Sequence, residues 1–192
     1  MNVSPPERIE LDDDTNLRWM TVDDAATVAR AVGESLDYLK PWMPWANAQS
    51  ADVEFQRGRL RNQPRQRERA EEWQYGLFGA DDAFLGSFGL MTRRGPGTLE
   101  IGYWLHVDAG NRGHATQSAR ALTEVGLQVD GVHRMMIVCD EANVRSAAIP
   151  KRLGYTLQRV EQRPREAPGE TGRTQFWVAD RIAARIPPAI TR

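Results

Sequence analysis

Hydrophobic and polar residues follow two different patterns along the first third of the chain. Over Ile9–Trp19 they alternate, which predicts a first β-strand. Over 26–36 apolar residues recur every three or four positions, the spacing of one helix face, and Thr21 stands where an N-cap is needed. Prolines interrupt the helical pattern in PWMPWA (41–46), and a second helix is predicted over Ser50–Pro64.

The rest of the chain reads as a series of short apolar strands separated by turn residues and two helices. Strands are predicted at 73–78, 84–91, 98–105 and 134–139, with one helix at 115–129 and another after Asn143. Two further strands complete the chain. The predicted order is β α α β β β α β α β β.

Composition is typical of one soluble globular domain. The 192 residues contain 41% hydrophobic and 27% charged residues, with a mean hydropathy of −0.56. This length predicts a single domain over 1–192, with its core at about 9–180 and short flexible termini. No apolar run approaches the roughly 20 residues of a membrane helix, and the first ten residues contain no apolar segment typical of a secretion signal. We therefore expect a cytoplasmic protein with no membrane partner.

The charge and cysteine content exclude two further classes. A formal net charge of −1 disfavours direct nucleic-acid binding, which needs clustered positive charge. The arginine-rich stretch at 56–69 is interleaved with acidic residues, so we interpret it as a solvated helix face, with an RNA contact as the alternative. Cys139 is the only cysteine, which rules out an intramolecular disulfide, and its apolar neighbours predict burial.

A glycine-containing turn joins the strand ending at 105–107 to the helix that begins near Ala115. Gly110 and Gly113 lie within this turn, AGNRGHA. The first N–H groups of a helix have no partner within the helix, and the helix dipole adds positive potential, so such a turn can hold a diphosphate without a metal. The alternative is a simple turn whose glycines only let the chain reverse.

These motifs resemble the GNAT superfamily of acyl-CoA-dependent N-acyltransferases, over nearly the whole chain. The family signature Arg/Gln-x-x-Gly-x-Gly/Ala falls on 110–115, with Gly110 in place of its first residue. Four segments resemble more specifically the RimJ/RimL branch, which acetylates N-terminal amines of ribosomal proteins. They are LKPWMPWA (39–46), IGYWL (101–105), HATQSARAL (114–122) and NVRSAAIPKRLGY (143–155).

The resemblance implies the GNAT fold, an α/β (α+β) architecture with a mixed, mostly antiparallel sheet flanked by helices. It also implies acetyl-CoA, or another acyl-CoA, as the cofactor, held by main-chain donors near Gly113. The residues to which it assigns cofactor binding are Val107, Arg112, Gly113, His114, Ala115, Thr116, Asn143 and Ser146.

The resemblance also indicates which residues carry the chemistry. In many GNAT enzymes a tyrosine supplies the proton for the departing thiolate, and here its position holds Pro150, which also predicts a short or kinked helix. In the RimJ/RimL branch a serine three residues after the asparagine takes this role, and Ser146 matches it; helix capping is the alternative. Asn143 is expected to bind the pantetheine arm or a water, unless it is only a turn residue. Glu100 is the candidate base, directly or through water, and a solvent-facing strand carboxylate is the alternative.

The acceptor side of the site is predicted at the aromatic loop. Trp42 and Trp45 would form a stiff aromatic wall, with Tyr38 and Tyr103 as secondary candidates. The alternative is that at least one of the two tryptophans is buried in the core. The three histidines show no metal-ligand spacing, so no metal is expected.

The predicted reaction transfers an acetyl group to a primary amine by direct attack in a ternary complex. A protein or peptide N-terminal α-amine, ribosomal or other, is the favoured acceptor, because its pKa of about 7.7–8.0 asks less of a base than the value of about 10.4 for lysine. The alternatives are a small-molecule amine, another donor such as succinyl-CoA, and a catalytically degenerate acyl-CoA-binding regulatory module. The oligomeric state is open, a homodimer included.

Overall fold

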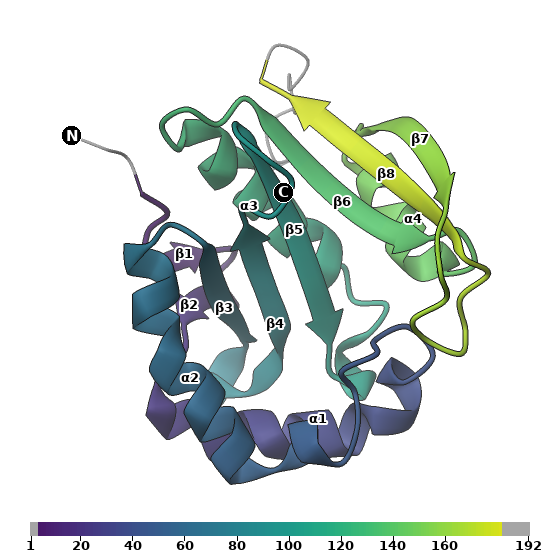
Figure 1. The fold of residues 1–192 in the computed structure, drawn as a ribbon. Coiled ribbons are helices and arrows are strands. Elements are labelled where there is room, and N and C mark those ends of the chain that lie inside the picture. Colours follow the sequence, from purple (N-terminus) through teal and green to yellow (C-terminus); the bar gives the residue numbers. More distant parts are fainter. Residues whose placement is uncertain (1–3, 182–192) are drawn as a thin grey trace.

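Eight strands form one mixed sheet in the computed structural model, which describes residues 4–181 (Figure 1). Their spatial order is β1-β2-β3-β4-β5-β6-β8-β7, and every neighbouring pair is antiparallel except β5 with β6. The predicted mixed, mostly antiparallel sheet is confirmed. The strands are β1 (Arg8–Glu10), β2 (Asn16–Trp19), β3 (Glu72–Phe78), β4 (Phe84–Met91), β5 (Thr98–Leu105), β6 (Arg134–Asp140), β7 (Thr156–Gln162) and β8 (Arg173–Asp180).

Two pairs of helices cover opposite faces of this sheet (Figure 1). Helices α1 and α2 pack on one face against β4 and β3, and α3 and α4 pack on the other face against β5, β6 and β8. Alternating strand residues point to opposite faces, so each face has its own apolar cluster. The helices are α1 (Ala25–Leu39), α2 (Val53–Glu68), α3 (His114–Gln128) and α4 (Val144–Arg152).

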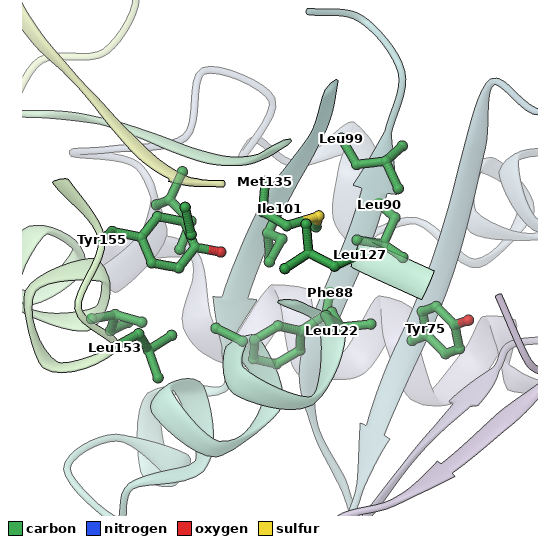
Figure 2. Close-up of a cluster of buried hydrophobic side chains, with 14 of the residues drawn as sticks. Tyr75, Phe88, Leu90, Leu99, Ile101, Leu122, Leu127, Met135, Leu153 and Tyr155 are labelled. Atoms are coloured by element: carbon green, nitrogen blue, oxygen red, sulfur yellow. The ribbon is translucent and has the colours of Figure 1, made fainter. Parts of the chain in front are cut away.

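The larger apolar cluster lies between the sheet and α3 (Figure 2). Leu122 of α3 is fully buried against Phe88, Leu90 and Ile101 of the central strands. Tyr155, just before β7, extends the cluster, and its hydroxyl lies 2.8 Å from Thr123 Oγ1. This packing fixes the start of α3 relative to the end of β5.

The central strands β5 and β6 separate after a short parallel pairing (Figure 1). Only 98–100 pairs with 134–136; beyond that point β6 stays with β8 and β5 stays with β4. The unpaired ends of the two strands therefore form a V-shaped opening in the sheet, next to the N-termini of α3 and α4.

The predicted single strand over Ile9–Trp19 is wrong, because a turn divides it into the β1–β2 hairpin. The Asp12 side chain accepts hydrogen bonds from Asp14 N (3.1 Å) and Thr15 Oγ1 (2.7 Å). Such a local side-chain-to-backbone bond reverses the chain where the hydrophobic alternation alone continues.

Helix α2 also passes the predicted end at Pro64 and continues to Glu68. Pro64 lies on the exposed side, where a missing N–H is tolerated. The arginine-rich face of this helix is not simply solvated. Arg59 donates to Gln56 and Gln74, and the guanidinium of Arg67 lies 4.2 Å from the Trp19 ring centre.

Candidate active site

The glycine-containing turn predicted before α3 is present, and its geometry depends on Gly113. This residue is the N-cap of α3 with φ +87°, a left-handed conformation that favours glycine. The N–H groups of Thr116 and Gln117 both donate to the Gly113 carbonyl at 3.0 Å. The N–H groups of His114 and Ala115 lie ahead of these helical bonds, and no side chain caps them. This helix start can therefore donate to an anion.

A cavity of about 480 Å³ lies beside this turn, between the end of β5 and the segment that leads from β6 into α4. Six of the residues predicted to bind the cofactor line it: Gly113, His114, Ala115, Thr116, Asn143 and Ser146. Two others do not. The N–H of Val107 donates to Ser35 Oγ of α1 at 3.1 Å, and Arg112 is exposed outside the cavity. The N–H of Val107 is thus engaged with α1, and cofactor binding by Val107 and Arg112 stays a prediction.

Two cationic residues of this cavity were not predicted from the sequence. Arg145 and Arg152 both belong to α4 and both line it. The Arg145 guanidinium lies 5.8 Å from the ring centre of Tyr38, which places Tyr38 on the cofactor cavity and not on the predicted acceptor side. Their spacing could have revealed them from the sequence, because two residues seven positions apart lie on the same face of a helix.

A second cavity of about 690 Å³ adjoins the first on the sheet face that carries α1 and α2. The two cavities share six lining residues: Trp42, Met43, Tyr103, Trp104, Asn143 and Ser146. The pair thus forms one passage through the opening between β5 and β6, with the start of α3 at one end. We call the smaller part the cofactor cavity and the larger part the acceptor cavity.

Ser146 lies where the two cavities meet, near the start of α4. Its N–H donates to Asn143 Oδ1 at 3.1 Å, so Asn143 caps the helix and the alternative capping role for Ser146 is wrong. The Ser146 hydroxyl lies 3.0 Å from the hydroxyl of Tyr103. Burial raises the pKa of the Tyr103 phenol, which therefore stays protonated at neutral pH. Ser146 thus points into the junction and is held there by two hydrogen-bonding neighbours.

Glu100 lines the acceptor cavity, but its carboxylate is already engaged. The side chain is only 4% exposed, and its two oxygens accept hydrogen bonds from Arg93 and Arg94. The predicted alternative, a solvent-facing carboxylate, is wrong. Each carboxylate oxygen already accepts one charge-assisted hydrogen bond, and two adjacent guanidinium groups make the carboxylate a weaker base toward an amine. The geometry therefore favours a positioning role for Glu100 over the predicted role as a base.

The aromatic loop borders the larger cavity, and its role in binding the acceptor stays a prediction. Trp42 is half-buried and lines both cavities, whereas Trp45 is 40% exposed and lines the acceptor cavity alone. The ring centre of Trp45 lies 5.9 Å from that of Trp104. Neither residue belongs to the buried core, so the alternative of a core tryptophan is wrong. The two rings are available as an aromatic wall.

The loop after β7 forms the opposite wall of the acceptor cavity. It is tied to the end of β6 by Asp140, which accepts from Ala142 N (2.9 Å), Thr171 N (3.1 Å), Thr171 Oγ1 (3.0 Å) and Gly172 N (2.9 Å). Burial alone would raise the pKa of Asp140, but these hydrogen bonds outweigh it and the pKa is lowered. The ionised carboxylate therefore fixes this wall at neutral pH.

The described residues give no support for a cysteine nucleophile or a metal site. Burial raises the pKa of the Cys139 thiol to about 11, so it is protonated at neutral pH and is a poor nucleophile. Within residues 4–181 no group of three or more His, Cys, Asp or Glu side chains could hold a metal ion. In the same part of the chain, every helix is too short or too polar to cross a bilayer.

The sequence matches the acetyltransferase (GNAT) domain family over residues 14–156. The chain therefore belongs to the GNAT acetyltransferase family, and the predicted family and fold are confirmed. The cofactor of this class is acetyl-CoA. A curated relative, the uncharacterized N-acetyltransferase YnaD of Bacillus subtilis (strain 168), is 28% identical over 74 residues, which are 38% of this chain. The aligned segment spans only 44% of the length of that relative.

Solved structures show the same fold over almost the full chain. RimL, a ribosomal L7/L12 alpha-N-protein acetyltransferase solved with coenzyme A, is similar with a TM-score of 0.81 at 18% identity, over 91% of this chain and 98% of RimL. The microcin C7 self immunity acetyltransferase MccE, solved with acetyl-CoA and AMP, also gives a TM-score of 0.81 at 18% identity, over 93% of this chain and 98% of MccE. At this identity the likeness shows the fold and leaves the acceptor open.

Gly110, which stands where the family signature has Arg or Gln, lines the cofactor cavity. Its backbone (φ −68°, ψ 156°) is open to any residue, and an added Cβ would meet only the Val107 carbonyl at 3.8 Å. We therefore expect Gly110→Arg to fold normally and to bind coenzyme A roughly tenfold more tightly, through one added charge-assisted bond to phosphate. Calorimetric titration with coenzyme A measures this. Gly110→Met, of similar length without charge, should leave the affinity unchanged, and equal affinity of the two variants would contradict the expectation.

Proposed function

We propose that the protein transfers the acetyl group of acetyl-CoA to a primary amine by direct attack in a ternary complex, without a covalent acyl-enzyme. The observation that supports this most is the passage itself. An anion cradle at the start of α3 lies at one end, an aromatic-walled acceptor cavity lies at the other, and Ser146 stands at the junction.

The residues of the cofactor cavity fit a diphosphate-bearing thioester carrier. The N–H groups of His114 and Ala115 would hold the diphosphate, and Arg145 and Arg152 add positive charge along the same cavity. When bound, acetyl-CoA supplies a thioester carbonyl at which the amine forms a C–N bond as the C–S bond breaks, the electron pair staying on sulfur and the amine's proton reaching it through water.

Ser146 would stabilise the leaving sulfur. A serine hydroxyl is a much weaker acid than a thiol, whose pKa is about 8.5, so its main contribution is a hydrogen bond to the developing thiolate. Ser146 is the third residue of α4, and the positive end of the helix dipole favours negative charge at this place. The Asn143 cap keeps the serine backbone at this helix start.

We propose that the acceptor is a protein or peptide N-terminal α-amine. No free base has to be supplied for such an amine: with a pKa near 8, about a tenth of it is neutral at pH 7, against less than about 0.1% of a lysine. This suits a site whose buried carboxylate, Glu100, is already held by Arg93 and Arg94. The acceptor cavity of about 690 Å³ has room for a terminal residue beside Trp42 and Trp45.

The second candidate is a small-molecule amine as acceptor, favoured by the similarity in fold to MccE, which was solved with AMP as well as acetyl-CoA. Another donor such as succinyl-CoA and a degenerate acyl-CoA-binding module are the remaining alternatives. Location in the cytoplasm and a homodimer stay predictions.

The purified protein should be incubated with acetyl-CoA and, separately, a library of peptides with free N-termini and a panel of small amines. Release of free thiol, followed by mass spectrometry of the acceptor, identifies the substrate class. We expect acetylation of peptide α-amines and not of lysine side chains in N-terminally blocked peptides. Release only with small amines would select the second candidate, and coenzyme A binding without release from any amine would select the binding module.

A separate prediction concerns Glu100. In Glu100→Gln we expect kcat/KM to fall by less than about tenfold and the acidic limb of the pH–rate profile to remain, because that limb reports the acceptor amine. Glu72→Gln, which changes another carboxylate of the acceptor cavity, is the matched control. A loss of about 100-fold or more in Glu100→Gln, with the acidic limb flattened, would instead identify Glu100 as the base.

A further inference from the structure

The Tyr103 hydroxyl has one proton and two acceptors on the same residue. It lies 3.3 Å from the carbonyl oxygen of Ser146 and 3.0 Å from Ser146 Oγ. If the phenol donates to the carbonyl, the serine hydroxyl must be the donor in the second contact. If the phenol donates to Oγ, the serine proton is free to point elsewhere. The contact therefore has two arrangements that differ only in the rotation of two O–H bonds.

Pro150 explains why the Ser146 carbonyl is open to Tyr103. In a regular α-helix the N–H of position 150 would donate to the carbonyl of position 146, and proline has no N–H. The residue that excludes a tyrosine from this helix position thus leaves an acceptor for a tyrosine from β5. The contact to this carbonyl is partly buried, and a carbonyl shielded from water without a donor is unfavourable, so the phenol replaces the missing helix donor.

Ring packing holds the Tyr103 side chain beside Ser146. Its ring stacks on Phe88, with ring centres 5.6 Å apart and planes inclined by 28°. The side chain reaches the junction of the two cavities from β5, while Ser146 reaches it from α4. The thiol of Cys139, on β6, is a further neighbour of the serine hydroxyl and stays protonated.

We infer that Tyr103 is a positioning residue that frees the Ser146 hydroxyl proton for the leaving sulfur by turning its own O–H from the Ser146 carbonyl to Ser146 Oγ. The inference rests on the proposed function. Before reaction the serine donates to the phenol oxygen and the phenol donates to the carbonyl. As negative charge develops on sulfur, the serine donates to sulfur and the phenol donates to Oγ. A hydroxyl that accepts one hydrogen bond is a stronger donor in the next, so the turn strengthens the bond to sulfur. No covalent bond to hydrogen breaks in this step.

The kinetic test is Tyr103→Phe, which keeps the ring and its stacking on Phe88. We expect kcat to fall roughly tenfold, the effect of one hydrogen bond, while KM for acetyl-CoA stays within about twofold. Tyr155→Phe is the matched control, because it removes another tyrosine hydroxyl, bonded to Thr123, from a buried residue that lines neither cavity. A wild-type kcat in Tyr103→Phe, or an equal loss in Tyr155→Phe, would overturn the inference.

Two further variants separate positioning from general support of the fold. If Tyr103 acts only through Ser146, adding Tyr103→Phe to Ser146→Ala should cause no further loss of kcat, whereas a purely structural effect would multiply. In Pro150→Ala the new N–H can bond the Ser146 carbonyl, so Tyr103→Phe should lower the thermal unfolding midpoint less in that background than in the wild type. Multiplying rates or equal midpoint shifts would contradict the inference.

The failure of the proposed function would look different. In that case the wild type releases no thiol from acetyl-CoA with any amine, and the catalytic inference falls with it. The unfolding comparison in the Pro150→Ala background would still show whether the Tyr103 contact to the Ser146 carbonyl exists. Active wild type with unaffected Tyr103→Phe would overturn the inference alone.

Discussion

Gly113→Val should reduce the affinity for coenzyme A by on the order of 100-fold or more. Gly113 adopts φ +87°, which a β-branched residue does not adopt without strain, so the valine would turn the first N–H groups of α3 away from their present direction. An added Cβ would also occupy open space at the cradle, where nothing lies within 4 Å, and would block a phosphate. The dissociation constant, from the shift of the unfolding midpoint with increasing coenzyme A, measures the effect.

Gly131→Val is the control for this variant. Gly131 also has positive φ, +76°, and open space around its Cβ position, but it lies in the turn before β6 and lines neither cavity. Both substitutions introduce similar backbone strain, so both should lower stability. Only Gly113→Val should lose coenzyme A. An equal loss of affinity in the two variants would show that strain, and not the cradle, is responsible.

Ser146→Ala should lower kcat by roughly 100-fold while coenzyme A affinity changes by no more than a few-fold. The serine hydroxyl faces the junction of the cavities, whereas the proposed diphosphate donors are backbone N–H groups of α3, so the diphosphate contacts do not depend on it. The substitution removes the hydroxyl that would donate a hydrogen bond to the leaving sulfur. This hydrogen bond becomes strong only as the sulfur gains negative charge, so its loss lowers kcat. Initial rates of thiol release give kcat, and calorimetry gives the affinity.

Ser118→Ala serves as the matched control for the loss of a serine hydroxyl. Ser118 of α3 is fully buried, and its Oγ has no hydrogen-bond partner. We expect wild-type turnover in this variant. Wild-type turnover in Ser146→Ala as well would remove Ser146 from the mechanism.

The central strands could be predicted from sequence because local signals agreed there. The predicted bounds of 84–91 and 98–105 coincide with β4 and β5, where apolar runs end at clear turn residues. The hairpin of β1 and β2 could not be predicted in this way. The alternation of apolar and polar residues continues through the turn at Asp12, so it gives no sign that the chain reverses there. The extension of α2 beyond Pro64 depends on which side of the helix faces solvent, which only packing decides.

In the candidate site, too, local features could be predicted from the sequence and long-range contacts could not. The cradle at Gly113 and the position of Ser146 follow from short motifs in which spacing determines geometry. The contact of Tyr103 with Ser146 joins residues 43 positions apart, and the bond of Val107 to Ser35 joins residues 72 positions apart. Neither leaves a local signal.

Glu100 is an intermediate case. Its two arginine partners lie six and seven positions earlier, within the turn between β4 and β5. A carboxylate in a strand that follows a turn with two arginines is a candidate ion-pair partner, and here that interpretation fits the structure better than a free base does.

The central claim is that main-chain donors at the start of α3 hold the diphosphate of an acyl-CoA, and calorimetric titration of the wild-type protein tests it most directly. Coenzyme A and acetyl-CoA should each bind one site per chain, and pantetheine, which lacks the diphosphate, should bind far more weakly. Absence of heat with both coenzymes, or equal affinity for pantetheine, would contradict the account.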